Sequence, residues 1–266
     1  MSALAAAFSP PGHKALIAYI TVGYPTIDAT LKVVPLLAQN GADIVELGIP
    51  FSDPLADGVT IQRSSFHALR NGVTPRLCLE VAKELSKKVN IPLVFMTYFN
   101  PVFNYGLETF CAACAGSGIS GLIIPDLPPE EGAELEAISQ RQGLDLIYLL
   151  APTSTEERIR LVAERSRGFI YLVSVTGVTG VRKSLPPDLA AFVSRVKGLT
   201  RQPICIGFGI STQGQASQIA RIADGVIVGS RVIQLMETED NLASLGNFVK
   251  ELRTALDKSG ASFKNC

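Results

Sequence analysis

Apolar and polar positions follow two alternating patterns along almost the whole chain. Short, nearly continuous apolar runs are separated by longer segments in which apolar residues recur at helical spacing. A strand that is buried on both faces reads as such an apolar run, which is typical of parallel sheets. The runs that predict strands are 15–22, 42–49, 91–98, 121–127, 145–151, 169–175, 203–208 and 224–228. The pattern therefore predicts eight parallel strands, each followed by helix.

The helical segments complete this repeat. Ser2 is expected to cap a short leading helix that ends near Phe8, and Ser154 to cap a later helix with Glu157 as its capping-box partner. Two helical segments follow the second strand, and extra helix follows the eighth. The remaining helices are expected near 26–38, 60–70, 74–88, 107–115, 130–142, 187–196, from 212, and up to about 258.

Eight strand–helix units in about 250 residues have the size of a (β/α)8 TIM barrel, an α/β fold. No linker or change of composition interrupts the repeat, so residues 1–266 are predicted to form one domain. The competing fold is a doubly wound open sheet. That fold usually carries a phosphate-binding glycine fingerprint after its first strand, and the segment from Thr21 to Tyr24 is not one. We therefore expect the barrel.

Composition excludes several classes of protein. The chain is 47% hydrophobic and 18% charged with a net charge of zero, and it has no basic tract, so nucleic-acid binding is not expected. No apolar run approaches the roughly 18 residues of a membrane span, and no secretion signal is evident, so we expect a cytoplasmic protein. The five cysteines have no disulfide-like spacing, and Cys111 and Cys114 are interpreted as packing residues.

The second strand carries an unusual carboxylate. Glu46 interrupts the apolar run 42–49, and the loop that follows adds Asp53 and Asp57. Side chains alternate along a strand, so Glu46 shares a face with Ile44 and Gly48. A carboxylate buried there is costly unless it is paired, and its pKa tends to rise, which is the profile of a general acid/base. A salt-bridged glutamate at a strand end is the alternative that the residues alone leave open.

A barrel predicts where a phosphate would bind. Active sites lie at the carboxyl ends of the strands, and phosphate often rests on the loops after strands seven and eight. Gly209 and Gly229 lie in those loops, and glycines let backbone N–H groups approach an anion closely. Only His13 and His67 are histidines, and no lysine ends a predicted strand. A histidine-rich metal site and a Schiff-base lysine are therefore not expected, which leaves carboxylate chemistry on a phosphorylated small molecule.

The segment VELGIPFSDPLADG (45–58) resembles the signature of the tryptophan synthase alpha chain family. Four further motifs of that family follow in the family's order: MTYFNP (96–101), GLIIPDLP (121–128), GVTG (177–180) and GFGIS (207–211). The resemblance implies a TIM barrel that cleaves indole-3-glycerol phosphate to indole and glyceraldehyde 3-phosphate without a cofactor or metal. It also implies a PLP-dependent beta-chain partner in an alpha2beta2 assembly that makes tryptophan.

The resemblance assigns roles residue by residue. It makes Glu46 the acid/base and Asp57 the carboxylate on the ring N–H, with Thr179 of the loop 176–180 closing over them as a lid. Phosphate would rest on Gly180, Gly209, Gly229 and Ser230. The indole and glycerol pocket would include Tyr19, Phe95, Tyr98, Ile123, Leu149, Tyr171 and Phe208. Partner contacts would involve Asp53, Pro54, Asn100 and Pro101.

Three alternatives remain at this point. The barrel could be a sugar-phosphate isomerase or epimerase, although such an enzyme would lack the pair Glu46 and Asp57. It could be a free-standing indole-3-glycerol phosphate lyase that works without a beta chain. It could also be a catalytically silent barrel that activates a beta chain, a role that the presence of both carboxylates disfavours.

Overall fold

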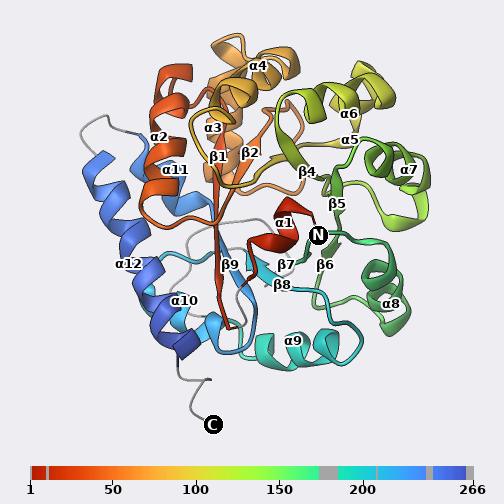
Figure 1. Cartoon of the computed structure of the whole chain (residues 1–266), viewed down its shortest axis with the longest axis vertical. Helices are drawn as coiled ribbons and strands as arrows, with labels where there is room; N and C mark the ends of the chain where they lie inside the picture. Colours follow the sequence, from red (N-terminus) through yellow and green to blue (C-terminus); the bar gives the residue numbers. More distant parts are fainter. Residues whose placement is uncertain (1, 10–11, 174–184, 208, 238–241, 262–266) are drawn as a thin grey trace.

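The computed structural model describes residues 2–9, 12–173, 185–207, 209–237 and 242–261. Within them, nine parallel strands form one sheet in the order β5-β4-β3-β2-β1-β9-β8-β7-β6, which curls into a barrel with helices outside it (Figure 1). The strands are β1 (Ala15–Thr21), β2 (Ile44–Gly48), β3 (Leu93–Met96), β4 (Ile119–Ile123), β5 (Asp145–Ile147), β6 (Leu149–Leu150), β7 (Ile170–Val173), β8 (Ile204–Gly207) and β9 (Gly225–Val228). The predicted TIM-barrel fold is confirmed.

The ninth strand arises from a break within the predicted fifth strand. β5 and β6 are separated only by Tyr148, whose N–H donates to the Ser166 hydroxyl at 3.1 Å and so leaves the strand ladder. The carbonyl of Tyr148 accepts from the N–H of Tyr171 at 3.1 Å. β5 thus pairs with β4, and β6 pairs with β7. Together they take the place of one strand of an eight-stranded barrel.

The helices pack outside the barrel, apart from α1, which lies across one end of it in Figure 1. They are α1 (Ala3–Ala6), α2 (Ile27–Gln39), α3 (Val59–Arg70), α4 (Pro75–Leu85), α5 (Phe99–Tyr105), α6 (Leu107–Gly116), α7 (Ala133–Arg141), α8 (Glu156–Arg165), α9 (Leu189–Lys197), α10 (Gln213–Ala220), α11 (Ser230–Leu235) and α12 (Leu242–Ala261), with a 3-10 turn, η1 (Pro129–Glu131), before α7. No helix in the described part of the chain is both long and apolar enough to span a bilayer.

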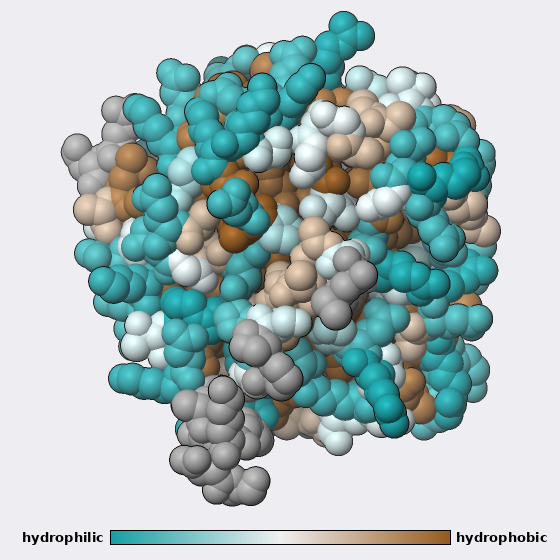
Figure 2. Space-filling view, viewed as in Figure 1, coloured by the Kyte–Doolittle hydropathy of each residue, from teal (hydrophilic) through white to brown (hydrophobic). Residues whose placement is uncertain are grey.

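Helix α1 closes the amino-terminal end of the barrel. The predicted Ser2 cap is present, since its hydroxyl accepts from the N–H of Ala5 at 3.2 Å. Leu4 is completely buried, and a Cβ on Gly121 of β4 would lie 2.8 Å from its Cδ1. Glycine at position 121 therefore leaves room for the Leu4 side chain of α1. Figure 2 shows the same face, on which hydrophilic residues predominate around the rim.

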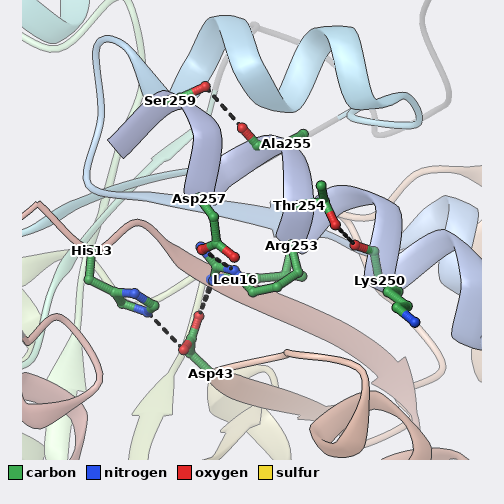
Figure 3. A network of polar contacts seen from close by, with 9 residues as sticks. All are labelled: His13, Leu16, Asp43, Lys250, Arg253, Thr254, Ala255, Asp257 and Ser259. Atoms are coloured by element: carbon green, nitrogen blue, oxygen red, sulfur yellow. Dashed lines mark hydrogen bonds and ion pairs between the residues drawn. The ribbon is translucent and has the colours of Figure 1, made fainter. Parts of the chain in front are cut away.

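A polar network fastens α12 to the same end of the barrel (Figure 3). The carboxylate of Asp43 accepts from His13 Nε2 at 2.8 Å, from the N–H of Leu16 at 2.7 Å and from Arg253 Nη1 at 2.9 Å. Arg253 also donates to Asp257 one turn further along α12, at 2.8 Å. The start of β2 is thereby held in place, and Glu46 is the middle residue of this strand.

Three local expectations needed correction. Helix α8 is capped by Thr155, whose hydroxyl accepts from the N–H of Arg158, while Ser154 accepts from the N–H of Ala151 in the preceding turn. Helix α5 was not expected, because Asn100-Pro101 also suits a turn. Pro101 is tolerated there because the first helical turn leaves N–H groups without partners. Strand β4 spans 119–123 instead of 121–127, and Pro125, which lacks an N–H, follows its end.

Candidate active site

Glu46 is buried inside the barrel at the middle of β2. Its neighbours across the sheet are Tyr19 on β1 and Val94 on β3. The side chain has no exposed surface, and neither carboxyl oxygen has a hydrogen-bond partner among the residues that the structure describes. Because burial disfavours the charged form, the pKa of Glu46 rises to about 8. The carboxyl group is therefore mostly protonated at neutral pH and can act as an acid.

Asp57 lies in the loop that follows β2 and is 6% exposed. Its backbone is held by two hydrogen bonds, from its N–H to the carbonyl of Pro54 at 3.0 Å and from Gln62 Nε2 to its carbonyl at 2.9 Å. Burial raises the pKa of the carboxyl group to about 6, and a hydrogen bond with the Tyr98 hydroxyl opposes that rise. Asp57 is therefore mostly ionised at neutral pH, whereas Glu46 is not.

One pocket at the carboxyl ends of the strands brings both carboxyl groups together with glycines from other strands. Gly209 after β8 and Gly229 after β9 lie on its wall, and Ser230 begins α11 there. Gly209 has a φ of 83°, a conformation that favours glycine. The residues that line the pocket are Tyr19, Glu46, Asp57, Ile61, Met96, Tyr171, Gly209, Ile210, Ile227, Gly229 and Ser230.

Two tyrosines share the inside of the barrel with Glu46, and each lies against a glycine of the neighbouring strand. A Cβ at Gly48 would come within 2.1 Å of the Tyr19 hydroxyl, and a Cβ at Gly207 within 2.4 Å of the Tyr171 hydroxyl. Real Cβ atoms do not approach so closely, so glycine is required at both positions for the rings to lie as they do. Burial raises the pKa of both hydroxyl groups, which keeps them neutral.

Gly48→Ala is expected to displace the Tyr19 ring and to lower kcat/KM at least tenfold, because the new methyl group occupies the position of the hydroxyl. The cost in unfolding free energy should be about 1–3 kcal/mol. Gly72→Ala is not a fair control because Gly72 has a φ of 76°, but Gly116, whose Cβ would meet no atom within 4 Å, offers one. Wild-type activity in Gly48→Ala, measured beside Gly116→Ala, would contradict this view of the Tyr19 position.

The structure brings most of the predicted site residues to the pocket or next to it. Tyr98 contacts Asp57 from outside the lining set, and Ile123 is fully buried at a position that pairs with Met96. Leu149 lines a neighbouring hollow that also includes Val173. Thr179, Gly180 and Phe208 lie outside the described residues.

Phe95 does not line the pocket, contrary to the prediction. It pairs with Leu47 and Leu122, on the face of the sheet that packs against helices, and its ring centroid lies 6.4 Å from that of Phe110 on α6. The neighbouring residue Met96 reaches the pocket instead. Ile61, Ile210 and Ile227 were also not anticipated. The register of β2 with β3 identifies Met96, because Glu46 pairs with Val94 and Met96 lies two residues further along on the same face.

The predicted partner-contact residues lie in two segments at the same end of the barrel, the loop after β2 and the first turn of α5. Asp53 and Asn100 are exposed, whereas Pro54 is buried and Pro101 is partly buried. Large apolar side chains lie exposed in the same two segments: Leu55 is 86% exposed, Val59 73% and Phe103 65%. Such a group of exposed apolar side chains marks a candidate protein-contact surface.

Comparison with known proteins shows the family. Residues 6–259 match the family model described as tryptophan synthase alpha chain. The chain belongs to the tryptophan synthase alpha chain family. The alpha chain of Dehalococcoides mccartyi is 59% identical over 257 residues, which cover 97% of this chain and 100% of that relative. The alpha chain of Geobacter sulfurreducens is 47% identical over 263 residues, covering 96% and 99%.

Solved structures agree with the family assignment. A structure from Aquifex aeolicus has a TM-score of 0.90 at 41% identity and covers 96% of this chain and 99% of that one. A structure of Mycobacterium tuberculosis tryptophan synthase has a TM-score of 0.89 at 39% identity, covering 96% and 98%. Membership of the tryptophan synthase alpha chain family makes the chain a lyase of tryptophan biosynthesis.

Proposed function

We propose that this alpha chain cleaves indole-3-glycerol phosphate by retro-aldol chemistry to indole and glyceraldehyde 3-phosphate, with no cofactor of its own. One observation carries the proposal: a single pocket holds two buried carboxyl groups, Glu46 and Asp57, and burial raises the pKa of Glu46 to about 8 but that of Asp57 only to about 6. Environments that drive two carboxyl groups to opposite protonation states are typical of acid/base enzymes. The reaction needs both states at once.

In the proposed reaction, Glu46 gives its proton to the indole carbon that bears the glycerol chain. The ring nitrogen becomes electron-poor, and Asp57 accepts a hydrogen bond from its N–H and stabilises the positive charge. Glu46, now a carboxylate, takes the proton of the hydroxyl nearest the ring. That oxygen forms the aldehyde, the carbon–carbon bond breaks, and its electrons return to the ring. Glu46 is protonated again at the end, so the cycle needs no outside acid.

The remaining pocket residues are assigned to binding. Backbone N–H groups of Gly209, Gly229 and Ser230 are proposed to hold the phosphate, together with Gly180 from the loop after β7. Tyr19 and Tyr171 lie in the pocket beside the carboxyl groups, where the indole ring and glycerol chain would sit. We further propose that Ile123, Leu149 and Phe208 complete the apolar wall, and that Thr179 holds Asp57 when substrate is bound.

We also propose that the chain works with a PLP-dependent beta chain in an alpha2beta2 assembly in the cytoplasm. The exposed Leu55, Val59 and Phe103 support this, because they flank Asp53, Pro54, Asn100 and Pro101 at the mouth of the barrel. Indole released there would pass directly to the partner. A free-standing lyase would have no use for such an apolar rim.

The direct test is to measure both products with and without a beta chain. Purified alpha chain and indole-3-glycerol phosphate should yield indole and glyceraldehyde 3-phosphate in equal amounts, and addition of beta chain should raise the rate. Absence of both products would overturn the lyase assignment. High turnover that the beta chain leaves unchanged would favour the free-standing enzyme.

The pH profile of kcat/KM is expected to be bell-shaped, rising as Asp57 loses its proton near pH 6 and falling as Glu46 loses its proton near pH 8. The substrate phosphate also ionises near pH 6. Tyr98→Phe separates the two contributions, because loss of the Tyr98 hydrogen bond should raise the pKa of Asp57 and move only the acid limb upward. An acid limb that stays in place in this variant would assign it to the phosphate.

A further inference from the structure

A chain of buried hydroxyl groups runs from the pocket into α3. The Tyr19 hydroxyl lies 3.3 Å from Thr21 Oγ1, and Thr21 Oγ1 lies 2.7 Å from Ser64 Oγ. Ser64 Oγ in turn donates to the carbonyl of Ile61 at 2.8 Å, one helical turn back. Thr21 and Ser64 have no exposed surface, and Tyr19 is 6% exposed. Each of these hydroxyls has a single proton to donate.

The hydrogen bond from Ser64 to the carbonyl of Ile61 determines the direction of the other two hydrogen bonds in the chain. A carbonyl can only accept, so the proton of Ser64 is used on Ile61. Thr21 must then donate to Ser64, and Tyr19 must donate to Thr21. The proton of Tyr19 therefore points away from the pocket, toward β1 and α3. What the Tyr19 hydroxyl can offer to a ligand is its oxygen, as an acceptor.

Tyr98, on the other side of Asp57, has the opposite role. Its oxygen accepts from the N–H of Ala56 at 3.0 Å, and its proton serves the hydrogen bond to the Asp57 carboxylate. Both functions of the Tyr98 hydroxyl are thus used by the protein. Asp57 keeps further acceptor capacity, because an ionised carboxylate has about four acceptor positions.

Tyr19 and Asp57 line the same pocket and lie close enough to influence each other. Asp57 is the charge that raises the pKa of the Tyr19 hydroxyl most, ahead of Glu46. An acceptor oxygen on Tyr19 and an acceptor carboxylate on Asp57 therefore line one pocket. Two acceptors in one pocket can share one N–H donor of a ligand.

We propose that the Tyr19 hydroxyl oxygen is a second acceptor for the ring N–H of the substrate, beside Asp57, and that the Thr21–Ser64–Ile61 chain holds it in that role. Tyr19 would then help the site to select ring systems that carry an N–H. This inference rests on the proposed cleavage of an indole substrate and deepens it.

The test compares two unreactive ligands that lack the hydroxyl nearest the ring: indole-3-propanol phosphate and its benzothiophene counterpart, in which sulfur replaces the N–H. The ratio of their dissociation constants, measured by calorimetry on the full chain, isolates the N–H contact. Wild-type chain should prefer the indole ligand. Tyr19→Phe should reduce that preference about 3- to 10-fold, the range expected for one neutral hydrogen bond, and should do so by weakening the indole ligand alone.

Thr21→Val tests the direction of the hydroxyl chain. It frees the Tyr19 proton, which can then turn to Asp57 and occupy an acceptor, so the indole preference should fall at least as far as in Tyr19→Phe. In the Tyr19→Phe background, Thr21→Val should have no further effect on the ratio. Tyr171→Phe is the matched control, since that buried tyrosine lines the same pocket and should leave the ratio unchanged.

The outcomes separate this inference from the proposed function. An unchanged ratio in Tyr19→Phe, or an equal effect of Thr21→Val in both backgrounds, would overturn the role of Tyr19 while leaving the lyase assignment intact. Failure of wild-type chain to bind either ligand would overturn both. Circular dichroism and thermal unfolding of each variant establish that the ratio is measured on folded protein.

Discussion

Glu46→Gln is expected to lower indole release from indole-3-glycerol phosphate by about 10²–10⁴-fold, the usual contribution of a general acid/base. The amide keeps the size of the carboxyl group but can neither give a proton to the ring carbon nor take one from the hydroxyl. No other described residue in the pocket is a protonated carboxyl group, because Asp57 is mostly ionised at neutral pH. Single-turnover measurements would place the loss in the chemical step.

The same substitution should leave binding and folding intact. Affinity for glycerol phosphate should be unchanged, because Gly209 and Gly229, which are proposed to hold phosphate, follow β8 and β9 and not β2. Glu134→Gln, at an exposed position on α7, is the matched control and should behave as wild type. Turnover within tenfold of wild type in Glu46→Gln would contradict the assignment of Glu46.

The stability of Glu46→Gln should depend on pH in a definite direction. Since burial raises the pKa of Glu46 from 4.5 to about 8, the folded state binds more protons than the unfolded state within this window. Wild-type stability therefore falls as the pH rises from about 4.5 to about 8. The variant lacks this titration and should become more stable than wild type by on the order of 5 kcal/mol above pH 8, since each unit of pKa shift is worth about 1.4 kcal/mol. Denaturant unfolding of both proteins at pH 5 and pH 8.5 would measure this difference in unfolding free energy, which should be present only at the higher pH.

Asp57→Asn is expected to lower kcat by about 10²–10³-fold. The asparagine oxygen can still accept from a ring N–H, but the neutral amide cannot stabilise the positive charge that develops on the ring. KM should therefore change much less than kcat, which is the pattern for an interaction made mainly in the transition state.

The control for Asp57→Asn is Asp28→Asn, at an exposed carboxylate in the first turn of α2, which should retain full turnover. Titration with glycerol phosphate should give the same affinity for both variants and for wild type. A rise in KM with unchanged kcat in Asp57→Asn would show that Asp57 only binds substrate, and would contradict its proposed role in the reaction.

The barrel could be predicted because its strands are short apolar runs and its helices have clear spacing. What the residues left open is which face of a strand points inward. A continuous apolar run such as 91–98 carries no such signal, so Phe95 and Met96 were equivalent until the register with β2 placed Met96 in the pocket. Glu46 could be found because a carboxylate interrupts its run.

Contacts between strands account for the rest of what sequence reasoning missed. Gly48 and Gly207 are ordinary glycines in the sequence, and only the neighbouring strands show that tyrosine hydroxyls occupy the space of their missing Cβ atoms. The chain from Tyr19 to Ser64 likewise joins residues that are 45 positions apart on β1 and α3. Local patterns do not contain such pairings, because the register of the sheet and the packing of α3 on β1 set them.

The proposed mechanism requires Glu46 to carry a proton at neutral pH, and infrared difference spectroscopy of the unliganded chain detects that proton. Wild type minus Glu46→Gln should show the carbonyl band of a protonated carboxyl group at pH 7, and this band should disappear with a midpoint near pH 8. A band that is already lost by pH 6, as for a carboxyl group near its ordinary pKa of 4.5, would contradict a protonated Glu46 at neutral pH.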